Sequence, residues 1–108
     1  MNPKEITSLS IVMPVYNEQE AITKVIEDYS SVLEKIEERE FVVVNDKSTD
    51  NTLAILESLQ KEHPYLRIIT QPKNSGHGAS LLRAYREAKG EYIFYCDSDN
   101  QFVAEDFW

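Results

Sequence analysis

The apolar residues of the chain gather in two kinds of stretch: short, nearly continuous runs and longer segments with helical spacing. The short runs are Leu9 to Val15, Phe41 to Val44, Leu66 to Thr70 and Tyr92 to Cys96. Runs of this length that are rich in β-branched or aromatic residues are typical of strands buried on both faces. They predict four strands of a parallel sheet.

A long helix is predicted between the first two runs, from about Glu18 to Glu38. Asn17 precedes it as an N-cap, and Glu20 stands three residues later, which is the spacing of a capping box. The acidic segment Glu34 to Glu40 is most simply the solvated end of this helix. Apolar residues recur with helical spacing at Ala21, Ile22, Val25, Ile26, Tyr29, Leu33 and Ile36.

Two further helices are predicted between the later runs. One begins with Asp50 as its cap and ends near His63, which precedes a proline. The other begins around His77 to Ala79 and stops at Gly90, a residue suited to the left-handed position after a helix. Inward-facing positions are predicted at Leu53, Leu56 and Leu59 in the former helix and at Leu82, Tyr85 and Ala88 in the latter.

This alternation of strands and helices predicts an α/β fold. The order is β-α-β-α-β-α-β, and the helical connections are long enough to join parallel strands. We therefore expect helices on both faces of the sheet, in a three-layer, Rossmann-like arrangement. At 108 residues the chain is near the usual size of one domain, and residues 1–108 are expected to form one.

The charge and the cysteine content limit which partners the protein can bind and in which compartment it is expected. The formal charge is −8, from 19 acidic and 11 basic residues, which argues against a surface that neutralises nucleic-acid phosphates. Cys96 is the only cysteine, so neither an intrachain disulfide nor a cysteine-rich zinc site is expected, and we predict a cytoplasmic protein. The longest apolar runs are far too short to cross a membrane.

Polar residues follow three of the predicted strands, in the segments Tyr16 to Glu18, Asp46 to Asn51 and Asp97 to Gln101. Because the carboxyl ends of parallel strands share one edge of a sheet, these segments should converge on a single crevice. Asp97 and Asp99 stand two residues apart, so on extended backbone their carboxylates point to the same side and can share a hard divalent cation. The alternative is an acidic turn after a strand.

The other candidate residues also have plainer interpretations. Tyr16 either stacks on a nucleobase or covers the following helix, and Asp46 either accepts hydrogen bonds from a base or ribose or caps its own loop. His77 stands between two glycines at a helix start, where N–H groups favour anions, although a tight entry into the helix also explains the glycines. The first turn has no glycine and no Walker motif occurs, so NAD, FAD and P-loop nucleotide binding are excluded.

Three segments together carry a family resemblance. They are SIVMPVYNEQEAI, VVVNDKSTDNT and NSGHGASLLRAYREAKGEYIFYCDSDNQ, which span almost the whole chain. In order and spacing they resemble the family 2 glycosyltransferases, inverting enzymes with a GT-A fold that use nucleotide-diphosphate sugars, and especially the polyprenyl-phosphate glycosyltransferase branch. The resemblance implies a partial GT-A fold, a UDP- or GDP-linked sugar donor and, in that branch, a lipid-linked acceptor.

The resemblance also implies roles for individual positions. A divalent cation, Mg²⁺ or Mn²⁺, would bridge the diphosphate oxygens and stabilise the leaving nucleoside diphosphate. The implied metal ligands are Asp97, Asp99 and Gln101. The implied nucleotide-sugar-binding residues are Pro14, Tyr16, Asn17, Glu18, Val44, Asp46, Asp97, Ser98 and Asp99.

Two places depart from the family pattern. Lys47 replaces a glycine, so the loop would be reshaped if that position needs a positive φ, and Val103-Ala104 replace an acid and a proline. The acceptor-binding half and the general base are expected beyond Trp108. We therefore expect residues 1–108 to be the nucleotide-binding half of a GT-A domain, which binds donor without full catalysis, at the cytoplasmic face of a membrane in a longer parent protein.

A non-catalytic scaffold or interaction module with the same fold is the alternative function. It predicts normal folding without metal-dependent ligand binding. In either case the strand Tyr92 to Cys96 is expected at an edge of the sheet if no further strand pairs with it. An unpaired hydrophobic edge offers its backbone to another chain, so self-association into a homo-oligomer is predicted.

Overall fold

The computed structural model describes residues 6–97. They form a four-stranded, fully parallel sheet in the order β3-β2-β1-β4. The predicted alternation of strands and helices is confirmed. Its strands are β1 (Ser8–Val15), β2 (Glu38–Asn45), β3 (Leu66–Thr70) and β4 (Tyr92–Tyr95), and its helices are α1 (Ile22–Leu33), α2 (Thr52–Glu62) and α3 (His77–Glu87).

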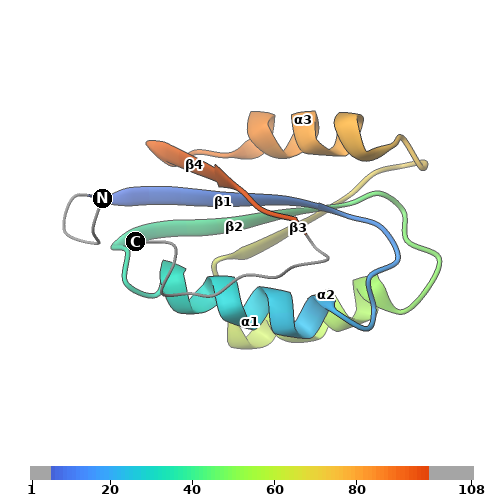
Figure 1. Ribbon diagram of the computed structural model, residues 1–108, viewed down its shortest axis with the longest axis horizontal. Coiled ribbons are helices and arrows are strands. Elements are labelled where there is room, and N and C mark those ends of the chain that lie inside the picture. Colours follow the sequence, from blue (N-terminus) through green and yellow to red (C-terminus); the bar gives the residue numbers. More distant parts are fainter. Residues whose placement is uncertain (1–5, 98–108) are drawn as a thin grey trace.

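Helices cover both faces of the sheet, as predicted. Figure 1 shows α1 and α2 below the sheet and α3 above it. The sheet has a hydrophobic core on each face, and successive residues of β1 point into opposite ones. Ile11 and Met13 pack with residues of α1, whereas Val12 packs with Ala84 of α3. The continuous apolar runs are thus explained, because both faces of these strands are buried.

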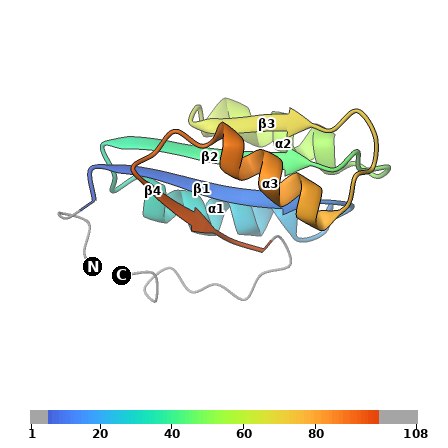
Figure 2. The same cartoon turned by 90° about the horizontal axis from the view of Figure 1, so that it is seen from above.

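The strand order creates a switch point beside β1. The chain moves outward from β1 to β2 and β3, and α3 then carries it back across the sheet to β4 on the other side of β1 (Figure 2). The crevice at the carboxyl ends of strands beside such a switch point is the usual ligand site of an open α/β sheet.

The first helix is shorter than predicted at its amino end. Its N-cap is Ala21 and no side chain caps it, so the predicted capping box of Asn17 and Glu20 is wrong. The Asn17 side chain has a tertiary partner instead, because its Oδ1 accepts the backbone N–H of Thr49 at 2.8 Å. A contact between distant loops therefore replaces the local cap.

The acidic segment 34–40 forms the end of a helix, as predicted, only at its first residue. Glu34 is the C-cap of α1, and a tight turn follows in which the Ile36 N–H donates to the Leu33 carbonyl at 2.9 Å. β2 already begins at Glu38, whose register partner is Ser8 of β1. Pairing with β1 extends this strand further toward its amino end than its apolar run indicates.

The inward face of α3 differs from the predicted one. Leu82 and Tyr85 are 50% and 41% exposed, so their predicted inward orientation is wrong. The residues of α3 that are buried are Ser80 and Ala84, and their small side chains allow the helix to lie close to the sheet.

Gly90 is needed for a close approach and does not terminate the helix as predicted. α3 ends at Glu87, and its C-cap Ala88 has extended backbone. The Gly90 N–H donates to the Ser10 hydroxyl at 2.7 Å, and a Cβ added to Gly90 would lie 2.6 Å from the backbone nitrogen of Ser10. Only glycine lets the segment before β4 approach β1 this closely.

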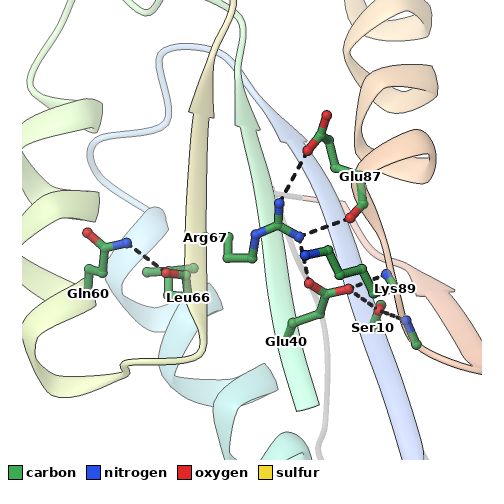
Figure 3. Close-up of polar contacts among 8 residues, drawn as sticks. Ser10, Glu40, Gln60, Leu66, Arg67, Glu87 and Lys89 are labelled. Atoms are coloured by element: carbon green, nitrogen blue, oxygen red, sulfur yellow. Dashed lines mark hydrogen bonds and ion pairs between the residues drawn. The ribbon is translucent and has the colours of Figure 1, made fainter. Parts of the chain in front are cut away.

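A polar cluster around Glu40 fastens the end of α3 to the sheet (Figure 3). The side chain of Glu40 is 13% exposed and accepts hydrogen bonds from the Ser10 hydroxyl at 2.5 Å, the Lys89 N–H at 2.5 Å and the Arg67 guanidinium at 2.7 Å. Arg67 also donates to the Glu87 carbonyl at 2.9 Å. Charge-assisted hydrogen bonds of this kind are among the stronger ones in proteins.

Removing the Glu40 charge is expected to destabilise the fold in a pH-dependent way. Burial alone would raise the pKa of Glu40, but the hydrogen bonds from Ser10, Lys89 and Arg67 outweigh it, so the pKa is lowered. A lowered pKa stabilises the fold above the unfolded-state pKa of about 4.3, and this contribution is lost as pH falls through the folded-state pKa. Glu40→Gln should therefore lower the free energy of unfolding by about 2 kcal/mol at neutral pH.

Urea denaturation of the wild-type protein and Glu40→Gln at several pH values measures this effect. The difference in unfolding free energy should shrink as the pH falls below about 4. A difference that is unchanged from neutral to acidic pH would show that the Glu40 charge does not contribute as described.

β4 lies at an edge of the sheet and pairs only with β1 among residues 6–97, as predicted. Its residues Tyr92 and Ile93 are each 40% exposed. Self-association through this edge stays a prediction.

None of the helices within residues 6–97 has the length and apolar character that crossing a membrane requires.

Candidate functional site

A pocket of about 340 Å³ lies at the carboxyl ends of β1 and β2, against the start of α3. This volume falls within the usual range of small-molecule sites. Two of the three predicted polar segments contribute to it, and the loop before α3 completes it. The residues that line it are Pro14, Val15, Tyr16, Glu18, Asp46, Asn74, Gly76, His77 and Ser80.

Asp46 binds the loop before α3 on one side of the pocket. The residue is 4% exposed, and its two carboxylate oxygens accept the N–H groups of Ser75 at 2.7 Å and Gly76 at 2.8 Å. A carboxylate has about four acceptor positions, so each oxygen keeps one for a ligand. Asp46 therefore closes the loop before α3 and still offers acceptor capacity in the pocket.

Pro14 near the end of β1 and Tyr16 just after it form one part of the pocket. Tyr16 is 43% exposed, whereas Pro14 is buried and is the register partner of Val44. Val44 is fully buried in the core under α3 and does not line the pocket. An exposed aromatic ring beside a buried carboxylate is an arrangement that suits a base or sugar ring.

Asn17 joins the two loops at this edge of the sheet and does not line the pocket. Its φ is 50°, and its Oδ1 accepts the N–H groups of Thr49 at 2.8 Å and Asp50 at 3.3 Å. Its own N–H donates to the Ser48 hydroxyl at 3.0 Å. Asn17 thereby fixes the path of the chain from Tyr16 to the helix, which is a positioning role.

Lys47 adopts a positive φ in the loop after β2. Its φ is 56°, and its Nζ donates to the Pro72 carbonyl at 3.4 Å. The left-handed conformation costs a residue with a Cβ about 1–2 kcal/mol. The loop after β2 therefore contains a left-handed residue at the position where the family pattern has glycine.

Asp97 follows β4 and connects to the pocket through two aromatic side chains. The Tyr95 hydroxyl donates to the Asp97 carboxylate and lies 3.2 Å from Nε2 of His77, which lines the pocket. Asp97 is exposed, so its oxygens are accessible to a hard cation, which suits a carboxylate ligand. Ser98, Asp99 and Gln101 lie outside the described residues.

Metal ligands cannot be assembled from the described part of the chain alone. Within residues 6–97, no group of three His, Cys, Asp or Glu side chains is placed to hold an ion.

Cys96 is 3% exposed, and burial raises the pKa of its thiol, so it is the core residue that the sequence predicts.

The loop and helix after β3 contribute residues to the pocket that no sequence pattern singles out. Asn74, Gly76 and Ser80 line the pocket, and Tyr95 links Asp97 to His77. The only local signal is the pair of glycines around residue 77, which marks a special backbone. Nothing in the sequence shows that the first turn of α3 packs over the end of β2.

Comparison with known proteins gives a consistent family match. The model of the family described as "Glycosyl transferase family 2" matches residues 10–107. A curated relative, a dolichyl-phosphate beta-glucosyltransferase of Trichomonas vaginalis, is 35% identical over 112 residues, which cover 98% of this chain and 33% of the relative.

Two solved structures share the fold. A mannosyltransferase of Pyrobaculum calidifontis in complex with GDP-Man and Mn²⁺ matches with a TM-score of 0.83 and 26% identity, over 97% of this chain and 31% of that one. TarS of S. aureus in complex with UDP-GlcNAc matches with a TM-score of 0.77 and 30% identity, over 92% and 28%. The chain therefore spans about a third of these relatives, and its sheet corresponds to the amino-terminal part of a GT-A fold, as predicted.

Proposed function

The chain belongs to glycosyl transferase family 2, and from that premise we propose that the pocket beside Asp46 binds a nucleotide-diphosphate sugar. The observation that carries this proposal is the meeting of Tyr16, Asp46 and the start of α3 in one pocket at the carboxyl edge of the sheet. The sugar is then transferred to an acceptor with inversion at the anomeric carbon.

Tyr16 and Asp46 hold the nucleoside in two different ways, by stacking and by hydrogen bonding. Tyr16 offers an exposed ring on which a base stacks, an interaction that is worth about 1–3 kcal/mol per base. The Asp46 carboxylate accepts from N–H or O–H groups of the base or ribose. Pro14 and Glu18 complete this side of the pocket, and Asn17 and Val44 support it from the loop and the core.

The proposed cofactor is Mg²⁺ or Mn²⁺, with Asp97, Asp99 and Gln101 as ligands and Ser98 between the two acids. When bound, the cation offsets the negative charge of the diphosphate and stabilises the leaving nucleoside diphosphate. The Tyr95 hydroxyl orients the Asp97 carboxylate by donating to it. The Mn²⁺ in the mannosyltransferase complex supports this choice of cation.

The acceptor class that we propose is a polyprenyl phosphate. The support is the dolichyl-phosphate beta-glucosyltransferase among the relatives. A non-catalytic scaffold with the same fold is the competing function. The observation in its favour is that Leu82 and Tyr85 are exposed and stand three residues apart on α3, so they share one face of the helix and form an apolar patch there.

Calorimetric titration of UDP- and GDP-sugars with and without Mn²⁺ separates these functions. We expect at least one donor to bind, and Mn²⁺ to tighten that binding by about tenfold or more, since the cation neutralises diphosphate charge. Asp99→Asn should remove the Mn²⁺ effect, whereas Asp28→Asn on the outer side of α1 should not. The scaffold function would be favoured if no donor binds. It would also be favoured if donor affinity is unchanged both by Mn²⁺ and by Asp99→Asn.

A further inference from the structure

The exposed large hydrophobic residues of the protein avoid the face of the sheet that α1 and α2 cover. Leu82 and Tyr85 are 50% and 41% exposed on α3, and Ile93 of β4 is 40% exposed. Within residues 6–97, no large hydrophobic residue of α1 or α2 is exposed. Exposed apolar side chains that gather in one area of a surface mark a site of interaction.

Ile93 lies on the same face of the sheet as α3. Tyr95, two residues further along β4, packs against the core under α3, and side chains two residues apart on a strand point to the same face. Figure 2 looks onto this face and shows β4 beside α3, whereas β1 and β2 run beneath the helix. The surface of β4 next to α3 is therefore accessible to a partner.

Tyr85 lies on the flank of α3 that is turned toward β4. The opposite flank carries Arg83, whose guanidinium donates to the Gln71 side chain at 3.1 Å, just after β3 at the other edge of the sheet. Residues two apart on a helix are separated by about 200°, so Tyr85 points away from β3. Leu82 precedes Tyr85 by three residues and shares its face of the helix.

This part of the chain is basic, although the protein as a whole is acidic. Residues 63–95, which include β3, α3 and β4, carry five basic and two acidic residues, a charge of +3. The remainder of the chain carries six basic and 17 acidic residues, a charge of −11. The two acids are Glu87, which forms an ion pair at 3.6 Å within α3, and the exposed Glu91. Arg86 and Lys89 are exposed cations close to the apolar side chains.

We propose that the surface formed by Leu82, Tyr85, Arg86, Lys89 and Ile93, the α3 surface, docks on an anionic lipid bilayer. Cations beside exposed aliphatic and aromatic side chains are typical of helices that lie on anionic membranes, because the cations attract the headgroups while the apolar side chains enter the headgroup region. None of these five residues lines the donor pocket, so the inference goes beyond donor binding. The choice of a bilayer as the partner rests on the lipid-linked acceptor of the proposed function.

The acidic remainder of the chain does not prevent this docking. Glu27 and Asp28 of α1 and Glu57 and Glu62 of α2 lie beyond the sheet from α3 (Figure 1). With a helix layer and a sheet layer each about 10 Å thick, these acids are about 20 Å from the α3 surface. Charges are screened over about 8 Å at physiological salt. The membrane charge therefore acts mainly on the near, basic side chains and orients the α3 surface toward the lipid.

Cosedimentation with lipid vesicles at physiological salt tests the inference. The chain should bind vesicles of phosphatidylglycerol and phosphatidylcholine in equal parts about tenfold or more tightly than vesicles of phosphatidylcholine alone. Arg86→Gln should weaken binding to the anionic vesicles about fivefold, and the double variant with Lys89→Gln about 25-fold, the usual contribution of a basic residue at an anionic surface. Leu82→Ser should weaken it about fivefold, because less apolar surface enters the lipid.

Lys61→Gln is the matched control, because Lys61 is an exposed cation of α2 on the opposite face of the sheet. It should leave the vesicle affinity unchanged. Binding to neither kind of vesicle, equal binding to both, or an equal loss in Lys61→Gln and Arg86→Gln would overturn the docking of the α3 surface. Binding of soluble polyglutamate in place of vesicles would assign this surface to an acidic protein and would also overturn it.

Titration of a UDP- or GDP-sugar separates this inference from the proposed function. Arg86 and Leu82 lie outside the donor pocket, so Arg86→Gln and Leu82→Ser should bind the donor as tightly as the wild type does. A chain that binds the donor but no vesicle overturns the docking alone. A chain that binds anionic vesicles but no donor overturns the proposed function and leaves the docking supported.

Discussion

Asp46→Asn is expected to weaken binding of a UDP- or GDP-sugar by about 10- to 100-fold, the usual worth of a hydrogen bond to a charged group. The amide keeps the size of the side chain but replaces one acceptor oxygen with a donor. The Ser75 and Gly76 N–H groups already occupy both sides of the carboxylate at 2.7 and 2.8 Å. The new NH₂ group therefore faces either a loop N–H or the N–H of the base, and neither can accept from it.

Asp50→Asn is the control for loop stability. Asp50 lies in the same loop and its Oδ1 accepts the Thr52 N–H at 2.9 Å, but Asp50 does not line the pocket of Asp46. Both variants should lose stability, and only Asp46→Asn should lose affinity in calorimetric titrations of the folded proteins. Equal donor affinities for the two variants would show that Asp46 serves the loop alone.

Gly90→Ala is expected to lower the free energy of unfolding by about 2–4 kcal/mol, from overpacking and a distorted hydrogen bond. The added Cβ would lie 2.6 Å from the Ser10 nitrogen and 2.9 Å from the Leu9 carbonyl carbon. Both are backbone atoms of β1, so relief requires β1 and the segment before β4 to separate. A loss of this size is a large part of a typical stability of about 5–15 kcal/mol.

Gly78→Ala is the matched control, with the opposite sign. Gly78 lies in α3, and an added Cβ would meet nothing within 4 Å. Alanine should stabilise the helix by about 0.5–1 kcal/mol. Urea denaturation measures both variants, and a Gly90→Ala protein as stable as the wild type would contradict the close approach described between β1 and the segment before β4.

The sheet could be predicted because its signal is local. In β1, Ile11 and Val12 face opposite cores, so residues 11–15 are all apolar and the strand is evident without knowledge of its neighbours. The same holds for residues 41–44 of β2. The ends of these strands then placed Tyr16 and Asp46 at one edge, since parallel strands share their direction.

Other elements depend on contacts that no local pattern contains. The capping box predicted at Asn17 fails because Thr49 competes for its side chain from the next loop. The inward face of α3 depends on how closely the helix approaches the sheet, so small Ser80 and Ala84 are buried and larger Leu82 is not. Ser80 lines the pocket for the same reason, because α3 packs against β1 and β2.

Amide chemical shifts in NMR, followed as a UDP-sugar or a GDP-sugar is added with Mg²⁺, test most directly whether the pocket beside Asp46 is the donor site. The backbone N–H groups of Ser75 and Gly76 donate to the Asp46 carboxylate and should shift most, together with that of Ser80. Mg²⁺ should extend the shifts to Asp97. Shifts confined to the outer faces of α1 and α2, or no shifts with either donor, would contradict the account.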